Sequence, residues 1–254
     1  MNQLEIKDLI LNFGGITALN KISITVKRGQ LHSVIGPNGA GKTSLFNVLS
    51  GVYVPTEGEI FLDGESLKSK KPHKIAEMGV ARTFQNIELF QNMSVIDNLL
   101  VGRHYLVKSG LFSGAFFYGK GLREEIFNLE KVEEVIDFLE IEKYRKSIVG
   151  TLPYGVQKRV ELGRALAMEP KLVLLDEPMA GMNVEETEDI ARFVLDINEE
   201  LEITVLMVEH DMGVVMDIAD WITVLNFGLK IGEGTPSEIQ SNPKVIEAYL
   251  GEDG

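Results

Sequence analysis

Eight consecutive residues of this chain combine glycine, lysine and threonine in an order suited to binding phosphate. The segment Gly36-Pro37-Asn38-Gly39-Ala40-Gly41-Lys42-Thr43 fits the pattern G-x-x-x-x-G-K-T. Glycines let the backbone approach phosphate oxygens, backbone N–H groups and the Lys42 ammonium supply positive charge, and the Thr43 hydroxyl can bind Mg²⁺. The alternative is a Gly-rich turn with an incidental lysine. We favour a site for the phosphates of a nucleoside triphosphate, because the flanking residues predict a strand before the loop and a helix after it.

Two neighbouring carboxylates follow a second apolar run. Leu172 to Leu175 are apolar and are followed by Asp176 and Glu177. Ligands of open α/β sheets bind at the carboxyl ends of buried parallel strands. We expect Asp176 to hold Mg²⁺, in part through water, and Glu177 to polarise the attacking water. The alternative is that both acids merely end a strand.

Two further polar side chains could complete such a site. His210 ends the apolar run from Val205, and its imidazole could hydrogen-bond the γ-phosphate or the attacking water. Gln85 follows Ala81-Arg82-Thr83-Phe84, and its neutral amide could contact both Mg²⁺ and the water. Either residue alone would have an ordinary structural explanation.

The flanking sequence predicts the elements that must position these groups. Alternating residues Leu4 and Ile6, and then Ile22, Ile24 and Val26, predict antiparallel strands around a turn at Gly14-Gly15. Further strands are expected over Leu31 to Ile35, Glu59 to Leu62, Leu172 to Leu175 and Thr204 to Val208. A helix over Ser44 to Leu49 follows the phosphate loop directly, so Ser44 joins the predicted nucleotide contacts.

The middle of the chain has a different pattern. Between about Ile96 and Ile148 apolar residues recur every three or four positions, as Val132, Ile136 and Leu139 do, which predicts helices. We therefore predict a single α/β domain over residues 1–254. Its nucleotide-binding core takes up about 1–85 and 165–254, with an antiparallel β subdomain, and a helical subdomain is inserted at about 86–164.

Composition limits the possible functions. Lys+Arg 25 against Asp+Glu 38 gives a net charge of −13, which argues against nucleic-acid binding. The chain has no cysteine, which excludes disulfides and thiolate metal sites. We also expect no membrane-spanning segment and no signal peptide, hence a location on the cytoplasmic side.

The order of these motifs resembles the ATP-binding subunits of ABC transporters, P-loop NTPase-like proteins. The matching residues are Phe13, Gly36 to Thr43, Gln85, the signature segment Leu152-Pro153-Tyr154-Gly155-Val156-Gln157, Asp176-Glu177, Ala180-Gly181-Met182-Asn183 and His210. The resemblance implies ATP and Mg²⁺ as ligands, with Mg²⁺ on Thr43, Gln85 and Asp176. It also implies that Phe13 stacks on adenine; the alternative is that Phe13 is a packing residue beside a glycine turn.

Some segments narrow the resemblance to subunits of branched-chain amino acid importers. They are Phe13 to Leu19, Ala81 to Gln85, Gly110-Leu111-Phe112-Ser113-Gly114, Ala180 to Asn183, Glu209 to Met212 and the stretch from Gly234 to Leu250. Relatives of this kind also serve the uptake of urea, short amides or other amino acids, so the solute is left open.

The signature segment departs from the family pattern Leu-Ser-Gly-Gly-Gln. Pro153 replaces the serine, Tyr154 the first glycine and Val156 the glutamine. The family places this segment against the γ-phosphate held by the partner subunit. Proline offers neither a hydroxyl nor an N–H there, but it suits the first turn of a helix, and Gly155 still allows a close approach. We expect an altered but usable signature.

The resemblance implies a second ATPase subunit, identical or related, transmembrane permease subunits and, indirectly, a solute-binding protein. It places the subunit on the cytoplasmic face of the membrane. The alternatives are a soluble, non-transport ABC-type ATPase and a nucleotide-binding regulatory domain without turnover. The charge of −13 and the single cassette disfavour the first, and Lys42, Asp176, Glu177 and His210 together disfavour the second.

The residues after Gln85 are unusually apolar for a loop. Ile87, Leu89, Phe90 and Met93 could line a groove for a short permease helix, which is where the family meets its membrane partner. The alternative is that they pack inward as core.

Overall fold

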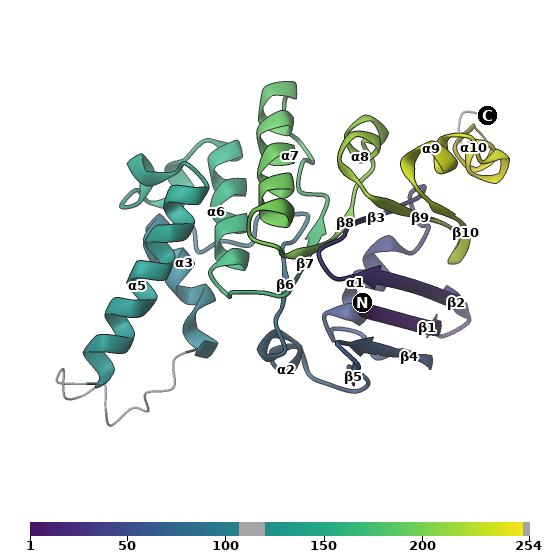
Figure 1. The fold of residues 1–254 in the computed structure, drawn as a ribbon, viewed down its shortest axis with the longest axis horizontal. Coiled ribbons are helices and arrows are strands. Elements are labelled where there is room, and N and C mark those ends of the chain that lie inside the picture. The colour runs from purple at the N-terminus through teal and green to yellow at the C-terminus, as the bar shows by residue number, and fades with distance from the viewer. Residues whose placement is uncertain (107–119, 251–254) are drawn as a thin grey trace.

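Two β-sheets form the centre of the computed structural model, which describes residues 1–106 and 120–250 (Figure 1). An antiparallel sheet has the strand order β2-β1-β4-β5, and a larger sheet has the order β10-β9-β3-β8-β7-β6. The strands are β1 (Asn2–Phe13), β2 (Ile16–Lys27), β3 (Leu31–Ile35), β4 (Glu57–Leu62), β5 (Glu65–Ser66), β6 (Val80–Arg82), β7 (Leu172–Asp176), β8 (Thr204–Val208), β9 (Trp221–Asn226) and β10 (Leu229–Gly234).

The larger sheet is buried on both faces. All residues of β3, β7 and β8 are buried, and these strands pair in parallel with one another and with β6 and β9. Successive side chains point to opposite faces. In β7, Val173 and Leu175 join one core cluster with helix α7 (Val184–Glu199), whereas Leu172 and Leu174 join a second cluster with helix α1 (Lys42–Leu49) and the antiparallel sheet. Burial on both faces explains the apolar runs of β7 and β8, whereas β3 also buries the polar His32 and Ser33.

Helices cover both faces of this sheet (Figure 1). They are α1 (Lys42–Leu49), α2 (Pro72–Glu77), α3 (Val95–Gly102), α5 (Lys120–Phe138), α6 (Tyr154–Leu166), α7 (Val184–Glu199), α8 (Met212–Ile218), α9 (Pro236–Gln240) and α10 (Pro243–Leu250), with short 3₁₀ turns η1 (His104–Leu106), η2 (Glu142–Tyr144) and η3 (Val149–Thr151). Among the residues that the structure describes, no helix combines the length and apolar character needed to cross a bilayer.

The teal helices α3, α5 and α6 gather at one end of the molecule in Figure 1. Val132, Ile136 and Leu139 of the α5 region are fully buried, as their spacing predicts. The segment that carries α3 and α5 begins and ends on adjacent backbone, since Ser94 and Ile148 form an antiparallel bridge and Val149 N–H donates to Met93 C=O (3.0 Å). Helix α6 follows this segment. The helices thus form an insert between β6 and β7.

The predicted elements are confirmed, with small differences at their ends. The hairpin of β1 and β2 turns at Gly14, whose φ of 56° suits glycine. Helix α1 begins at Lys42 rather than Ser44, because the phosphate loop itself supplies the first helical N–H groups. Helix α6 begins at Tyr154, with Pro153 at its N-cap. The segment Gly110 to Gly114 lies outside the described residues.

Candidate functional site

The phosphate loop links the buried strand β3 to helix α1. Gly36, Gly39 and Gly41 have φ values of 152°, 79° and 106°, a region that other residues rarely adopt. The ammonium of Lys42 is buried and donates to the carbonyls of Gly36 (2.6 Å) and Pro37 (3.1 Å). These two bonds hold the positive charge inside the curve of the loop, at the N-terminus of α1.

Two of the glycines are also required by close packing. A Cβ on Gly36 would lie 2.1 Å from the carbonyl oxygen of Leu225 in β9, and one on Gly41 would lie 2.8 Å from the carbonyl oxygen of Ala18 in β2. A Cβ on Gly39 would meet no atom within 4 Å. The loop is therefore wedged between both sheets at its ends and open to solvent at its middle.

A cavity of about 500 Å³ lies over the loop. It brings together most of the predicted nucleotide contacts with residues from distant segments. The lining residues are Ile16, Thr17, Ala18, Asn38, Gly39, Ala40, Gly41, Lys42, Thr43, Ser44, Gln85, Glu177, Phe227 and Gly228. Phe13 is not in this set: its ring packs edge-on against Tyr53, with centroids 5.1 Å apart. Whether Phe13 stacks on adenine stays a prediction.

Gln85, Glu177 and His210 converge at one edge of the cavity. The Gln85 amide donates to Glu177 Oε2 (3.0 Å), and His210 Nδ1 lies 3.5 Å from the same oxygen. Glu177 adopts a φ of 47° directly after β7, and its N–H donates to the carbonyl of Val208 at the end of β8 (2.9 Å). This strained turn aims the carboxylate away from the strand axis, towards Gln85 and His210.

The buried carboxyl of Glu209 binds the backbone N–H of His210 and that of Met179. Glu209 is 1% exposed; its Oε1 accepts the N–H of Met179 (3.0 Å) and its Oε2 accepts the N–H of His210 (3.1 Å). Burial raises the pKa of Glu209 above its ordinary value, although both N–H groups oppose the shift. Glu209 therefore fixes the backbone of both segments that carry the carboxylate and the imidazole.

Asp176 lies apart from this group and is held by an arginine that we did not predict. Arg82 Nη2 donates to Asp176 Oδ2 (2.7 Å), and both side chains are less than a tenth exposed. Arg82 also reaches the first helix, through Asn47 Oδ1 (2.8 Å) and Ser50 Oγ (2.9 Å). In the sequence, the only indication of this role was a single cationic residue three positions before Gln85. In the structure, Arg82 positions Asp176 relative to α1.

The signature segment forms the N-terminus of α6. Tyr154 Oη donates to the carbonyl of Ala180 (3.0 Å), and Gln157 Nε2 donates back to the carbonyl of Leu152 (2.8 Å). Gly155 is buried against Glu186 of α7, whose Oε1 would lie 2.7 Å from an added Cβ. The segment Ala180 to Asn183 therefore packs beside the signature within one chain.

Helix α6 also holds the backbone around Gln85. Lys158 Nζ donates to the carbonyl of Gln85 (2.9 Å), while Glu161 Oε1 accepts the N–H groups of Phe84 and Glu88 (3.4 Å each). The two side chains also pair with each other (3.4 Å) and are no more than 3% exposed. Burial raises the pKa of Glu161, against the effect of Lys158. We call this pair the Lys158–Glu161 clamp. Two opposite charges three residues apart in α6 were its sequence signal.

Comparison with known proteins identifies the family. The model for ABC transporters matches residues 19–180. The chain belongs to the ABC transporter family. A second model, described as a branched-chain amino acid ATP-binding cassette transporter, matches residues 230–254. The chain is 43% identical to the high-affinity branched-chain amino acid transport ATP-binding protein BraF of Pseudomonas aeruginosa, and the match covers 98% of each chain. It is 41% identical to the corresponding LivG protein of Salmonella typhimurium, again over 98% of each.

Solved structures agree on the fold. The ADP conformation of MJ1267, an ATP-binding cassette of an ABC transporter, matches with a TM-score of 0.86 and 33% identity over 99% of each chain. The nucleotide-free form of an ATP-binding cassette matches with a TM-score of 0.85. The fold predicted from the sequence is therefore confirmed. This ABC family member binds ATP and is an ATPase.

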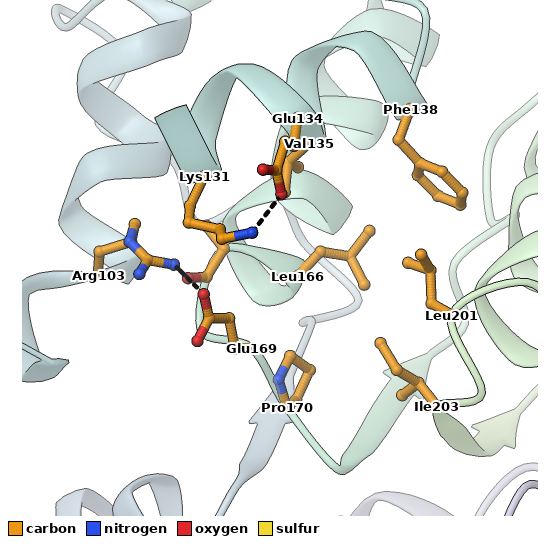
Figure 2. A pocket seen from close by; sticks show the side chains of 11 residues that line it. Arg103, Lys131, Glu134, Val135, Phe138, Leu166, Glu169, Pro170, Leu201 and Ile203 are labelled. Atoms are coloured by element: carbon orange, nitrogen blue, oxygen red, sulfur yellow. Dashed lines mark hydrogen bonds and ion pairs between the residues drawn. The ribbon is translucent and has the colours of Figure 1, made fainter. Parts of the chain in front are cut away.

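Another hollow in the structure has a different character. Figure 2 shows a cavity of about 340 Å³ between α5, the end of α6 and the segment that leads into β8, with Phe138, Leu166 and Leu201 on its walls. Its charged groups are engaged with one another, since Lys131 pairs with Glu134 (2.7 Å) and Arg103 with Glu169 (3.1 Å). It therefore offers packing surface rather than a polar binding group.

Proposed function

We propose that this ATPase energises the import of branched-chain amino acids through a membrane permease. The named relatives carry out that transport, and both family models match this chain in its core and at its C-terminal end. Other small polar solutes are the alternative cargo. We place the subunit on the cytoplasmic face of the membrane, where ATP is available.

The contact of Gln85 and His210 with Glu177 carries the catalytic part of the proposal. Glu177 Oε2 faces the phosphate cavity, with an amide at 3.0 Å and an imidazole nitrogen at 3.5 Å. A carboxylate in this position can orient water for in-line attack and polarise it, while the imidazole and amide restrict its rotation. Lys42 and the loop N–H groups stabilise the charge that develops on the β- and γ-phosphates.

The site also suits Mg²⁺. The Thr43 hydroxyl and the Gln85 amide oxygen are hard donors beside the phosphate loop, and Asp176 ends the adjoining strand. Within the described residues, no three His, Cys, Asp or Glu side chains cluster as a metal cage. Mg²⁺ commonly binds through one or two protein oxygens and the phosphates themselves, so a cage of three such side chains is not needed. The ion would neutralise phosphate charge when bound.

We further propose that two subunits, identical or related, share two ATP molecules. The signature N-terminus of α6 would face the γ-phosphate on the partner, with Pro153 in place of a hydroxyl donor. The division into a core at about 1–85 and 165–254 and a helical subdomain at about 86–164 is part of this proposal. It is supported by the run of helices α3, α5 and α6 between β6 and β7, of which α3 and α5 lie between the bridged residues Ser94 and Ile148.

The permease contact has a candidate surface beside the helical insert. A cavity of about 660 Å³ lies between α2, α3 and α6, with Met93, Leu100 and Tyr105 in its lining. Of the apolar residues that follow Gln85, Met93 lines it, whereas Leu89 is 8% exposed and belongs to the core. The groove prediction is thus wrong for Leu89. Phe90 is 50% exposed nearby, with its backbone held by the buried Asn98.

The catalytic proposal is tested with Glu177→Gln. Loss of a catalytic carboxylate lowers turnover by about 10²–10⁴-fold, whereas ATP binding should persist because the shape is kept. Lys42→Ala is the matched variant, and calorimetry should show that it loses ATP affinity. Wild-type turnover by Glu177→Gln in a steady-state ATPase assay would refute the role given to Glu177.

The permease contact is tested with Phe90→Asp. A carboxylate on this half-exposed position should abolish binding to the permease and solute uptake, while ATP binding and thermal melting stay unchanged. Val54→Asp, at 65% exposure outside the helical insert, is the matched control. If Phe90→Asp unfolds the protein, Phe90 is a core residue and the contact is wrong.

A further inference from the structure

The turn between β9 and β10 contains a costly residue. Phe227 and Gly228 have φ values of 45° and 74°, and they connect the paired residues Asn226 and Leu229. Such two-residue turns favour Asn-Gly or Asp-Gly, since both positions need positive φ. A bulky side chain in this conformation is an outlier. Phe227 is also 84% exposed, so burial offsets little of the strain.

The turn is attached directly to the phosphate loop. Gly228 N–H donates to the carbonyl of Ala40 (3.0 Å), and Gly228 C=O accepts the N–H of Asn20 in β2 (2.8 Å). A Cβ on Gly228 would lie 2.7 Å from the carbonyl oxygen of Ala18. These contacts leave the turn little conformational freedom, and they therefore fix the position of the Phe227 Cα from which the ring projects.

The ring borders the mouth of the phosphate cavity. Phe227 lines it together with Ile16, which is 72% exposed, and Ala18. Apolar side chains beside a phosphate cradle suit the flat base and sugar of a nucleotide, because an aromatic face stacks on either. Phe13 lies against Tyr53 instead, with 44% of its surface exposed.

We propose that Phe227 is a nucleotide contact, whose ring packs against the base or sugar of the bound triphosphate. The inference rests on the proposed ATP site and adds to it a contact from the β9–β10 turn. It explains why a strained position holds a large exposed aromatic residue where asparagine would be better tolerated.

The decisive variant is Phe227→Asn. Because Asn-Gly suits this turn, the nucleotide-free protein should melt at the same temperature or higher. Calorimetric titration with Mg-ATP should nevertheless show about tenfold weaker binding, the scale of one lost stacking contact. If Phe227 had a purely structural role, the ATP affinity and the melting temperature of the variant would rise or fall together.

Inorganic tripolyphosphate with Mg²⁺ separates the base from the phosphates. Its affinity should be equal in wild type and Phe227→Asn, since the phosphate cradle is intact. Leu229→Asn, a 47% exposed neighbour on the same hairpin, should leave both titrations unchanged. Unchanged Mg-ATP affinity in Phe227→Asn, or an equal loss for tripolyphosphate, would overturn the proposal. Failure of the wild type to bind Mg-ATP would instead refute the ATP site itself.

Discussion

The phosphate loop and the Gln85 loop bring polar side chains to the same cavity by different means. The phosphate loop takes its shape from its own glycines, and Lys42 bonds to carbonyls five and six residues away. The Gln85 loop takes its shape from α6, through a clamp about 75 residues further along the chain. The phosphate loop thus depends on its own glycines and on the strands against which they pack, whereas the Gln85 loop depends on side chains of a separate helix.

This difference predicts that steric clashes at its glycines destabilise the phosphate loop. Gly36→Ala places a Cβ 2.1 Å from the Leu225 carbonyl, so β9 or the loop must move, and we expect the free energy of unfolding to fall by about 4 kcal/mol or more. Gly39→Ala is the control, because it meets no atom and costs about 1–2 kcal/mol through its φ alone. Urea denaturation of both variants measures the gap. Equal losses would show that the loop is not wedged at its Gly36 end.

The Gln85 loop should instead lose its conformation when the Lys158–Glu161 clamp in α6 is broken. Lys158→Met leaves Glu161 buried without its cation, which should cost about 3 kcal/mol of stability and lower kcat without changing KM for ATP. The double variant Lys158→Met/Glu161→Gln removes the buried charge as well and should recover most of the stability but not the turnover. Full recovery of turnover would mean that the clamp does not position Gln85.

A further effect, which develops only below about pH 6.5, concerns the strand beneath the phosphate loop. His32 in β3 is 1% exposed, its Nε2 lies 2.9 Å from Thr223 Oγ1, and burial lowers its pKa to about 3. Between about pH 6.5 and 3 the unfolded chain binds this proton and the folded chain does not. Stability from neutral His32 is therefore present above about pH 6.5 and falls by roughly 1.4 kcal/mol per pH unit below it. His32→Gln should flatten the pH dependence of unfolding by that slope, and parallel curves would contradict it.

The same contrast explains what the sequence could predict. Local patterns identified the phosphate loop, the strand that ends at Asp176, the strand that ends at Val208 two residues before His210, and the turn at Gly14, since each is encoded by adjacent residues. The Lys158–Glu161 clamp and the Arg82–Asp176 pair join distant segments. A charged residue in the sequence does not reveal which distant segment its side chain will contact. The role of Phe227 was hidden for a similar reason, because strain appears only once φ is known.

The bridge between Ser94 and Ile148 has a consequence for how this chain can vary. The segment with α3 and α5 begins and ends on neighbouring backbone, and β6 and β7 pair directly with each other, so the spacing between these strands does not depend on what that segment contains. Residues could be gained or lost within it without changing the register of the central strands. The α3–α5 segment is therefore the part of the helical region whose length can change while α6 keeps its contacts with the Gln85 loop.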